Sequence, residues 1–289
     1  SLAADFELIV LGAAQDGVDQ VWVDYEILPA VITLDEALAD DAPLVWPTGT
    51  PGETGEAAAH GAEVGGDKQE EKPSNIAAES KFERGDLAEG FAAADVVVER
   101  PFTTPMVHQS YLEPFAMLVQ LDPMGNGATV WTSTQAPFYV REEVADVLGV
   151  EETAVRVIPT PVGGAFGAKF LHYELLVAAA AHAVRRPVKL ALTRSEDMLA
   201  ANPAPPAQFH IKLGMKKDGT ITALEADVKF DAGCYPSPHG IAAFLMGSLY
   251  QIPHMQIRYT EVMTHKLSTA AYRAPGAPQA AFVLESAID

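Results

Sequence analysis

The chain has 289 residues and 48% of them are apolar, so it can bury a sizeable core in one large domain or two modest ones. Its net charge of −20 argues against a nucleic acid partner, because a phosphate backbone attracts basic surfaces. The single cysteine excludes an internal disulfide and a four-cysteine metal site within this sequence, and no run of about 20 apolar residues predicts a membrane span.

The first elements are expected before residue 45. Apolar and polar residues alternate over 21–28, which is typical of a strand. Thr33 is suited to cap a short helix that begins at residue 34. The first five residues lack the basic and apolar regions of a signal peptide and resemble the middle of a domain. We therefore expect a shortened or processed chain.

Between residues 46 and 80 the composition changes. Gly, Glu, Pro, Ala and Lys dominate, and large apolar residues nearly vanish. Such a segment buries too little apolar surface to offset the entropy lost on ordering. The composition predicts a long surface linker that proteases reach easily.

From residue 81 to 289 the pattern is that of a dense α/β domain. Strands are predicted over residues 96–100, 117–121, 128–134, 154–159, 188–193, 209–215, 221–230 and 257–264. Helices are predicted over residues 87–94, 138–148, 169–184, 241–249 and 277–288. Asp218 and Gly219 lie between two alternating segments and predict a hairpin turn.

Three loops, each between a strand-like and a helix-like run, hold groups that suit an anionic cofactor. They are residues 132–135 (TSTQ), 163–169 (GGAFGAK) and 271–279 (AYRAPGAPQ). Glycines let backbone amides approach a ligand closely, and a helix N-terminus adds partial positive charge. The Gln135 amide could donate to a ligand oxygen, and the Arg273 guanidinium could bind a phosphate or carboxylate.

Each loop alone also has an ordinary structural interpretation. The glycine loop is no Walker A motif, because Phe170 stands where that motif has serine or threonine, and it lacks the dinucleotide-binding spacing. It could simply join a strand to a helix. Gln135 could cap a helix, and Arg273 could form an ion pair with Glu285 or Asp289. The histidines have no spacing typical of a metal site.

Taken in order, these segments resemble the molybdopterin-binding (large) subunit of the xanthine dehydrogenase/aldehyde oxidase family. The matching segments are His108 with 112–114 (LEP), 133–135 (STQ), 155–169, 186–189 (RPVK), 194–197 (RSED), 218–219 (DG), 231–233 (DAG), 250–253 (YQIP) and 272–285. Residues 22–38 resemble the end of the α/β hammerhead domain that precedes it. The resemblance implies mixed α/β sheets, with the end of a hammerhead domain at 1–45, a linker at 46–80 and the first half of the molybdopterin-binding domain at 81–289.

The resemblance implies a molybdenum hydroxylase, a cytoplasmic enzyme that takes its oxygen from water. The cofactor would be molybdenum–molybdopterin in its cytosine dinucleotide form, with 2Fe–2S clusters and FAD on partner subunits. The pterin dithiolene would hold the metal, so no side chain of this chain would be a direct ligand. The alternative is a non-catalytic relative that serves as an assembly scaffold or a cofactor carrier.

The family's site residues carry over by position. Gln135 matches the amide that hydrogen-bonds the apical oxo ligand, and Arg273 matches the arginine near the metal centre. Phe166 and Gly167 match the family's glycine-loop residues beside the metal, with Gly164 and Ala165 on the approach. The family usually has glycine at Ala165, so slightly less room for the pterin is implied.

Three positions of the implied substrate pocket depart from the purine hydroxylases. Phe170 replaces a glutamate, Ile241 an arginine and Pro275 a stacking phenylalanine, so xanthine is not the expected substrate. Ala274 stands where CO dehydrogenase has its copper-binding cysteine, so CO oxidation is not expected either. The less polar pocket suits an aldehyde or an aromatic heterocycle.

The family's catalytic glutamate lies in a second half of the domain, beyond Asp289. Glu113, Glu174 and Glu285 are not in its motif, so no catalytic residue is assigned to this chain. The resemblance therefore implies a fragment or a split subunit that is inactive when isolated. Its partners would be the C-terminal half of the molybdenum domain or a second molybdopterin subunit, an iron–sulfur subunit and a flavin subunit.

Overall fold

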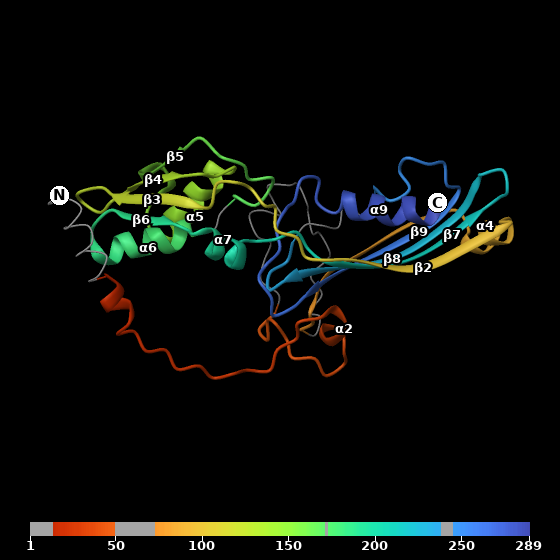
Figure 1. Ribbon diagram of the computed structural model, residues 1–289, viewed down its shortest axis with the longest axis horizontal. Coiled ribbons are helices and arrows are strands. Elements are labelled where there is room, and N and C mark those ends of the chain that lie inside the picture. Colours follow the sequence, from red (N-terminus) through yellow and green to blue (C-terminus); the bar gives the residue numbers. More distant parts are fainter. Residues whose placement is uncertain (1–13, 50–72, 171–172, 238–244) are drawn as a thin grey trace. The chain divides into compact units, whose positions relative to one another are not determined.

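A computed structural model describes residues 14–49, 73–170, 173–237 and 245–289 (Figure 1). Contacts within the chain divide it into two units, residues 1–30 and 31–289. Among the described residues, none of the helices combines the length and the apolar character needed to cross a membrane.

In the first unit, the strand predicted over residues 21–28 does not form. These residues lie outside any helix or strand, and their side chains are exposed, with Trp22 at 91% and Ile27 at 94%. A strand must pair its N–H and C=O groups with a neighbour, and in the described part of the chain no strand pairs with this segment. The prediction was wrong because alternating apolar and polar residues indicate that a segment could bury one face of a strand, but they do not show that a neighbouring strand is there to pair with it.

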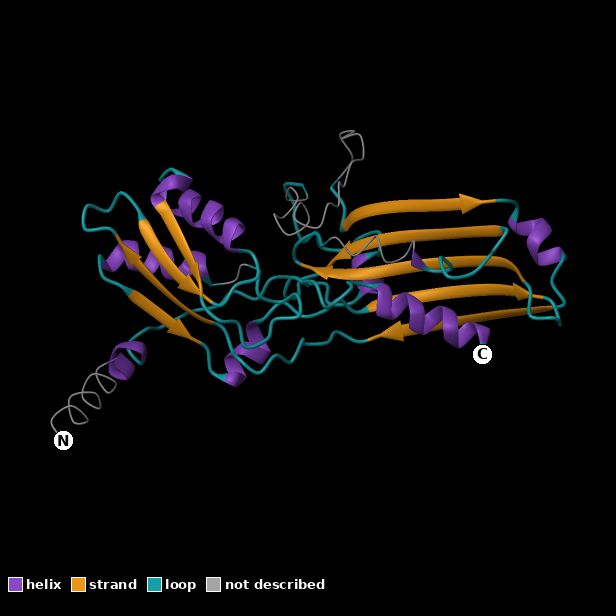
Figure 2. Ribbon diagram, turned by 90° about the horizontal axis from the view of Figure 1, so that it is seen from above, coloured by secondary structure: helices purple, strands orange, loops and turns teal. Residues whose placement is uncertain are grey.

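The second unit contains a five-stranded sheet of order β1-β9-β8-β7-β2. Its strands are β1 (Ile76–Arg84), β2 (Val96–Thr104), β7 (Ala207–Met215), β8 (Ile221–Gly233) and β9 (His254–Met263). Only β8 and β9 pair in parallel, and the other neighbours are antiparallel. The apolar side of the helix α9 (Ala277–Ile288) packs against the sheet. Figure 2 shows this helix, at the C-terminus, lying over the strands. The short helix α4 (Leu87–Ala92) contacts β8 and β9.

The same unit contains a four-stranded sheet of order β5-β4-β3-β6. Its strands are β3 (Ala116–Leu121), β4 (Ala128–Thr132), β5 (Val155–Pro159) and β6 (Val188–Ala191). The helices α5 (Pro137–Leu148) and α6 (Glu174–Val184) pack on each other and on this sheet, and α7 (Arg194–Ala200) follows β6. A single turn, η1 (Glu152–Ala154), precedes β5. Because β4 and β5 pair in parallel, their carboxyl ends lie at one edge of the sheet.

The predicted strands and most predicted helices of this region are present, with small shifts at their ends. The predicted helix 169–184 begins only at Glu174, because the Lys169 carbonyl accepts a hydrogen bond from Gln135 instead of one from a helical turn. Of the predicted helix 241–249, residues 241–244 lie outside the described residues, and 246–249 form turns. The hairpin turn is confirmed, with Gly219 at a φ of +88°.

The segment before β1 differs from the predicted linker at its end. β1 begins at Ile76, and the buried Asn75 side chain donates to the carbonyls of Ala37 and Pro43. Residues 50–72 of the predicted linker lie outside the described residues. Upstream, Thr33 caps the helix α2 (Leu34–Ala37), as predicted, and its side chain accepts from the backbone N–H of residue 36.

Candidate functional site

The structure brings the three predicted loops into contact through backbone hydrogen bonds. Gln135 N donates to Lys169 O at 2.7 Å, which joins the first loop to the end of the glycine loop. Arg273 N donates to Phe166 O at 2.9 Å, which joins the third loop to its middle. Gly167 N donates to the Gln135 side-chain Oε1 at 2.9 Å. The three loops therefore form one connected cluster around residues 163–169.

The glycine loop has a backbone that only some residues can adopt. Gly164 and Gly167 have φ angles of +97° and +108°, and Phe166 is a non-glycine residue at +54°. A Cβ atom on Gly167 would lie 2.4 Å from the carbonyl oxygen of Ala271. The glycine is thus required for the third loop to approach this closely. Between the two glycines, Ala165 is buried and Phe166 is 47% exposed.

The polar groups of Gln135 and Arg273 remain available to a ligand. Both residues are exposed. Because Gln135 Oε1 accepts from Gly167, its Nε2 is left as a donor, and it has no partner in the described part of the chain. Arg273 forms no ion pair with any described residue, and Glu285 instead accepts from the Tyr250 hydroxyl at 2.7 Å. The structural alternative of an Arg273–Glu285 pair is therefore not observed.

The predicted substrate-pocket residues are only partly placed by the structure. Phe170 follows the glycine loop and is half-buried, and its carbonyl accepts from the Thr134 hydroxyl at 2.8 Å. Pro275 is also half-buried and follows Arg273 by two positions. Ile241 lies outside the described residues. Whether these three residues share a pocket stays a prediction.

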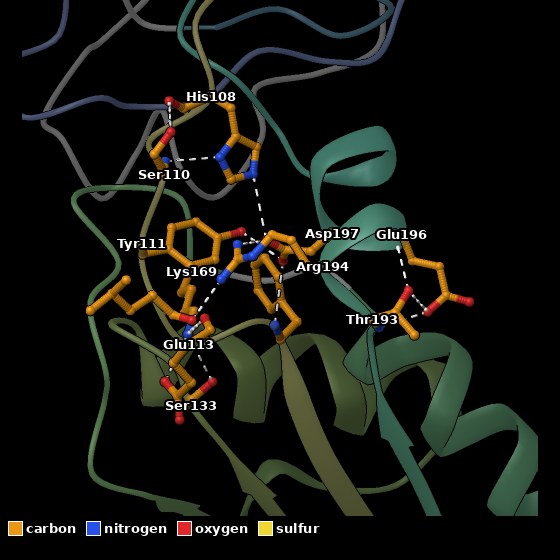
Figure 3. A network of polar contacts seen from close by, with 12 residues as sticks. His108, Ser110, Tyr111, Glu113, Ser133, Lys169, Thr193, Arg194, Glu196 and Asp197 are labelled. Carbon is orange, nitrogen blue, oxygen red and sulfur yellow. Dashed lines mark hydrogen bonds and ion pairs between the residues drawn. The ribbon is translucent and has the colours of Figure 1, made fainter.

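Next to the loops lies an ion pair between Lys169 and Glu113 that sequence reasoning did not predict (Figure 3). The Lys169 side chain is fully buried, and its Nζ donates to the Glu113 carboxylate and to the Glu113 carbonyl, both at 2.8 Å. The same carboxylate accepts from Gly163 N at 2.8 Å. Burial acts to raise the pKa of Glu113, but the hydrogen bonds from Lys169 and Gly163 outweigh it and lower the pKa below its ordinary value. The signal in the sequence was a lysine between a glycine loop and an apolar helix.

A buried carboxylate, that of Asp197, lies on the other side of the same segment (Figure 3). It accepts from the Tyr111 hydroxyl and from Arg194 Nη1, each at 2.9 Å. Arg194 Nη2 also donates to Leu112 O at 2.6 Å. Burial and the contact with Asp197 raise the pKa of Tyr111, so its hydroxyl stays protonated and donates. The segment that carries Glu113 is thereby held from α7 as well.

Comparisons with known proteins show which family the chain is similar to. The family model of the molybdopterin cofactor-binding domain matches residues 68–289. The Escherichia coli K12 protein named "Probable hypoxanthine oxidase XdhD" is 31% identical, over 92% of this chain and 29% of that protein. The nicotinate dehydrogenase large molybdopterin subunit of Eubacterium barkeri is 29% identical, over 92% of this chain and 58% of that subunit. The aldehyde oxidoreductase of Desulfovibrio gigas has a TM-score of 0.78 at 27% identity, over 94% of this chain and 28% of that chain. This chain thus spans less than two thirds of each relative.

Proposed function

The chain belongs to the molybdopterin-binding subunits of the xanthine dehydrogenase/aldehyde oxidase family, and we propose that it forms the first half of the molybdenum domain of a molybdenum hydroxylase. The observation that carries the proposal is the contact between the three loops, which gathers Gln135, the glycine loop and Arg273 into one cluster. The family resemblance and the mixed α/β fold predicted from the sequence are confirmed by these matches.

The groups at the cluster fit an anionic pterin cofactor. Gln135 Nε2 is an unpartnered donor among the described residues, and Arg273 is an exposed cation without an ion pair there. The two glycines at positive φ let the backbone lie close to a ligand. When bound, molybdenum–molybdopterin supplies the redox chemistry, and the protein supplies position and polarity. In this proposal the cofactor-binding residues are Gln135, Gly164, Ala165, Phe166, Gly167 and Arg273.

The carboxylates near the cluster are already engaged, which supports a catalytic base supplied from elsewhere. Glu113 pairs with Lys169, and the buried Glu174 accepts from the Thr132 hydroxyl at 2.6 Å. Neither is placed to take a proton from a reacting group without breaking these contacts. We therefore propose that the catalytic glutamate comes from the second half of the domain, on the same or another chain.

The finer parts of the proposal concern cofactor form, substrate and assembly. We infer the cytosine dinucleotide form of the cofactor, 2Fe–2S and FAD on partner subunits and a cytoplasmic enzyme. The nicotinate dehydrogenase relative is named as a large subunit, which supports a multi-subunit assembly. In this proposal Phe170, Ile241 and Pro275 line a weakly polar substrate pocket, so the substrate is an aldehyde or an aromatic heterocycle. Water supplies the oxygen.

Metal analysis and pterin fluorescence of the complete native assembly test this function. We expect molybdenum and pterin in equal amounts, together with oxidation of an aldehyde or an aromatic heterocycle. Absence of both molybdenum and pterin would contradict the proposed enzymatic function. Bound cofactor without turnover on any such substrate would instead indicate a cofactor carrier.

A further inference from the structure

We propose that Glu113 and Lys169 are positioning residues, which fasten both ends of the glycine loop and thereby fix the backbone that faces the cofactor. The proposal rests on the function proposed above, because it assigns a purpose to the fixed loop. Neither residue is assigned a role by the family resemblance. The evidence is the pattern of contacts, the burial of the lysine and the way the contacts continue into the other two loops.

A single carboxylate oxygen of Glu113 accepts hydrogen bonds from both ends of the loop. Glu113 Oε2 accepts from Gly163 N, at the start of the loop, and from Lys169 Nζ, at its end, each at 2.8 Å. Figure 3 shows the Glu113 and Lys169 side chains of this contact. The contact also runs in the other direction, because Glu113 N donates to Gly163 O at 3.2 Å. Lys169 Nζ donates to the Glu113 carbonyl at 2.8 Å. The loop 163–169 is thus closed on one residue.

Burial leaves the Lys169 ammonium group few alternative positions. Its side chain is fully buried, and Nζ lies 4.8 Å from the Tyr111 ring centroid and 5.6 Å from that of Phe115. A third contact goes to Ser133 Oγ at 3.4 Å. A buried ammonium group must keep its partners, because an unpaired buried charge is strongly destabilising. Lys169 cannot reach a ligand directly, so it acts through the position of the loop.

The contacts continue from Lys169 into the residues that face the cofactor. Its carbonyl accepts from Gln135 N at 2.7 Å, and Gln135 Oε1 in turn accepts from Gly167 N at 2.9 Å. Phe166 is a non-glycine residue at a φ of +54°, a conformation that persists only where surrounding contacts impose it. Loss of the Glu113–Lys169 pair should therefore loosen the loop and the Gln135 amide together.

The segment that carries Glu113 is itself anchored. On its other side, Arg194 donates to Leu112 O at 2.6 Å and also to the buried Asp197 at 2.9 Å. The Tyr111 hydroxyl donates to the same Asp197 at 2.9 Å. Glu113 thus links a fixed segment to a loop that has no regular secondary structure of its own. This is the arrangement expected of a residue that holds a loop in place.

The test uses the complete native enzyme carrying the variants Lys169→Met, Glu113→Ala and Glu113→Gln. Glu152→Gln is the matched control, since it removes the charge from an ion pair of the same 2.8 Å length, between Arg141 and Glu152. Amide hydrogen exchange is measured in the loop 163–169 and in α5, and molybdenum and pterin are measured after prolonged dialysis. Melting temperatures report the global stability of each variant.

We expect Lys169→Met and Glu113→Ala to speed exchange in the loop by about tenfold, the effect of losing roughly one hydrogen bond to a charged group, with α5 unchanged. Both should also lose molybdenum and pterin faster. Glu113→Gln should lie between them and the wild type, because its amide oxygen still accepts from Gly163. Glu152→Gln should match the wild type in every measurement.

Several outcomes would overturn the proposal. Exchange that rises equally in the loop and in α5 would mean a general structural role, as would cofactor loss that follows only the fall in melting temperature. Unchanged cofactor retention despite faster loop exchange would remove the positioning role. If Lys169→Met does not fold, the two Glu113 variants test the proposal, because the Glu113 side chain is 32% exposed and its replacement is less disruptive. A wild-type enzyme without molybdenum and pterin would refute the proposed function, while the exchange measurement would still test the fastening of the loop.

Discussion

Gln135 carries two hydrogen-bonding groups with different tasks. Its Oε1 accepts from Gly167 N at 2.9 Å, and its Nε2 has no partner among the described residues. In the complete enzyme, Gln135→Glu keeps an acceptor for Gly167 but removes the donor. If that donor stabilises the bound cofactor during the reaction, turnover per molybdenum should fall by about a hundredfold, or roughly 3 kcal/mol.

Gln135→Ala removes both groups, so it should also lower the free energy of unfolding by about 1 kcal/mol. Turnover per molybdenum and melting temperature, measured together on both variants, separate the two tasks. If both variants keep wild-type turnover per molybdenum, Gln135 does not belong to the active site. The assignment of the other two loops would then be weakened as well.

Gly167 is constrained both by its backbone angle and by its neighbour. An alanine there would have an unfavourable φ of +108° and a Cβ 2.4 Å from Ala271 O. Gly219 is a matched control, because its φ is +88° and a Cβ would meet nothing within 4 Å. Gly219→Ala should cost about 1 kcal/mol for backbone strain alone, and Gly167→Ala clearly more. Chemical denaturation measures both, and equal losses would show that the approach to Ala271 imposes no constraint.

At the scale of elements, periodicity predicted most strands and helices, because apolar spacing follows the face that each element buries. Two of the three predicted loops follow neighbouring strands of one sheet. The loops after β4 and β5 come together because Thr132 pairs with Pro159 at the ends of two parallel strands. The loop containing Arg273 follows β9, a strand of the other sheet, and no local pattern indicates that it meets Phe166. The family resemblance matched both residues to positions near the metal centre but did not specify that contact.

The places where the structure differs from the prediction have one physical cause. Each depends on whether a residue far away in the sequence pairs with the segment. The Lys169 carbonyl accepts a hydrogen bond from Gln135, so α6 begins later than predicted. The Lys169 side chain pairs with Glu113, which is distant in the sequence and close only in the fold. The segment 21–28 has the pattern of a strand but no strand beside it in the described part of the chain. Sequence reasoning thus predicted the elements that follow from a local pattern and missed the contacts that form only in the fold.

The predicted linker and β1 offer matched sites for a glutamate-specific protease. Glu53, Glu56 and Glu63 lie in the segment whose composition predicts a linker, whereas Glu79 and Glu83 lie in β1. Cleavage requires a locally extended, unpaired backbone, and β1 is paired to β9. We expect the first cuts at the three upstream sites, identified by mass spectrometry. If Glu79 is cut as early as Glu56, the contrast between the two segments is wrong.

At the scale of the whole molecule, stability depends on carboxyl groups that respond to pH in opposite directions. The pKa of Glu113 is lowered in the folded state, so its contribution is present above its ordinary value of 4.5 and is lost as the pH falls through the folded value. Glu261 on β9 behaves in the opposite way. It is buried, and burial raises its pKa to about 7 despite hydrogen bonds from Ser237 N and the Tyr259 hydroxyl.

The sign of the Glu261 effect follows from its two protonation equilibria. Between its ordinary pKa of 4.5 and about 7, the unfolded chain has released the proton while the folded chain still holds it. Raising the pH through this window therefore favours unfolding, by roughly 1.4 kcal/mol for each pH unit, and above it the contribution no longer changes. Glu261→Gln cannot titrate, so urea denaturation at pH 5 and pH 7.5 should show a smaller loss of stability than in the wild type, whatever the variant's absolute stability. Glu152→Gln, which changes an exposed carboxylate, should keep the wild-type difference. An equal loss in Glu261→Gln and the wild type would mean that the Glu261 carboxyl is already ionised in the folded protein across this range.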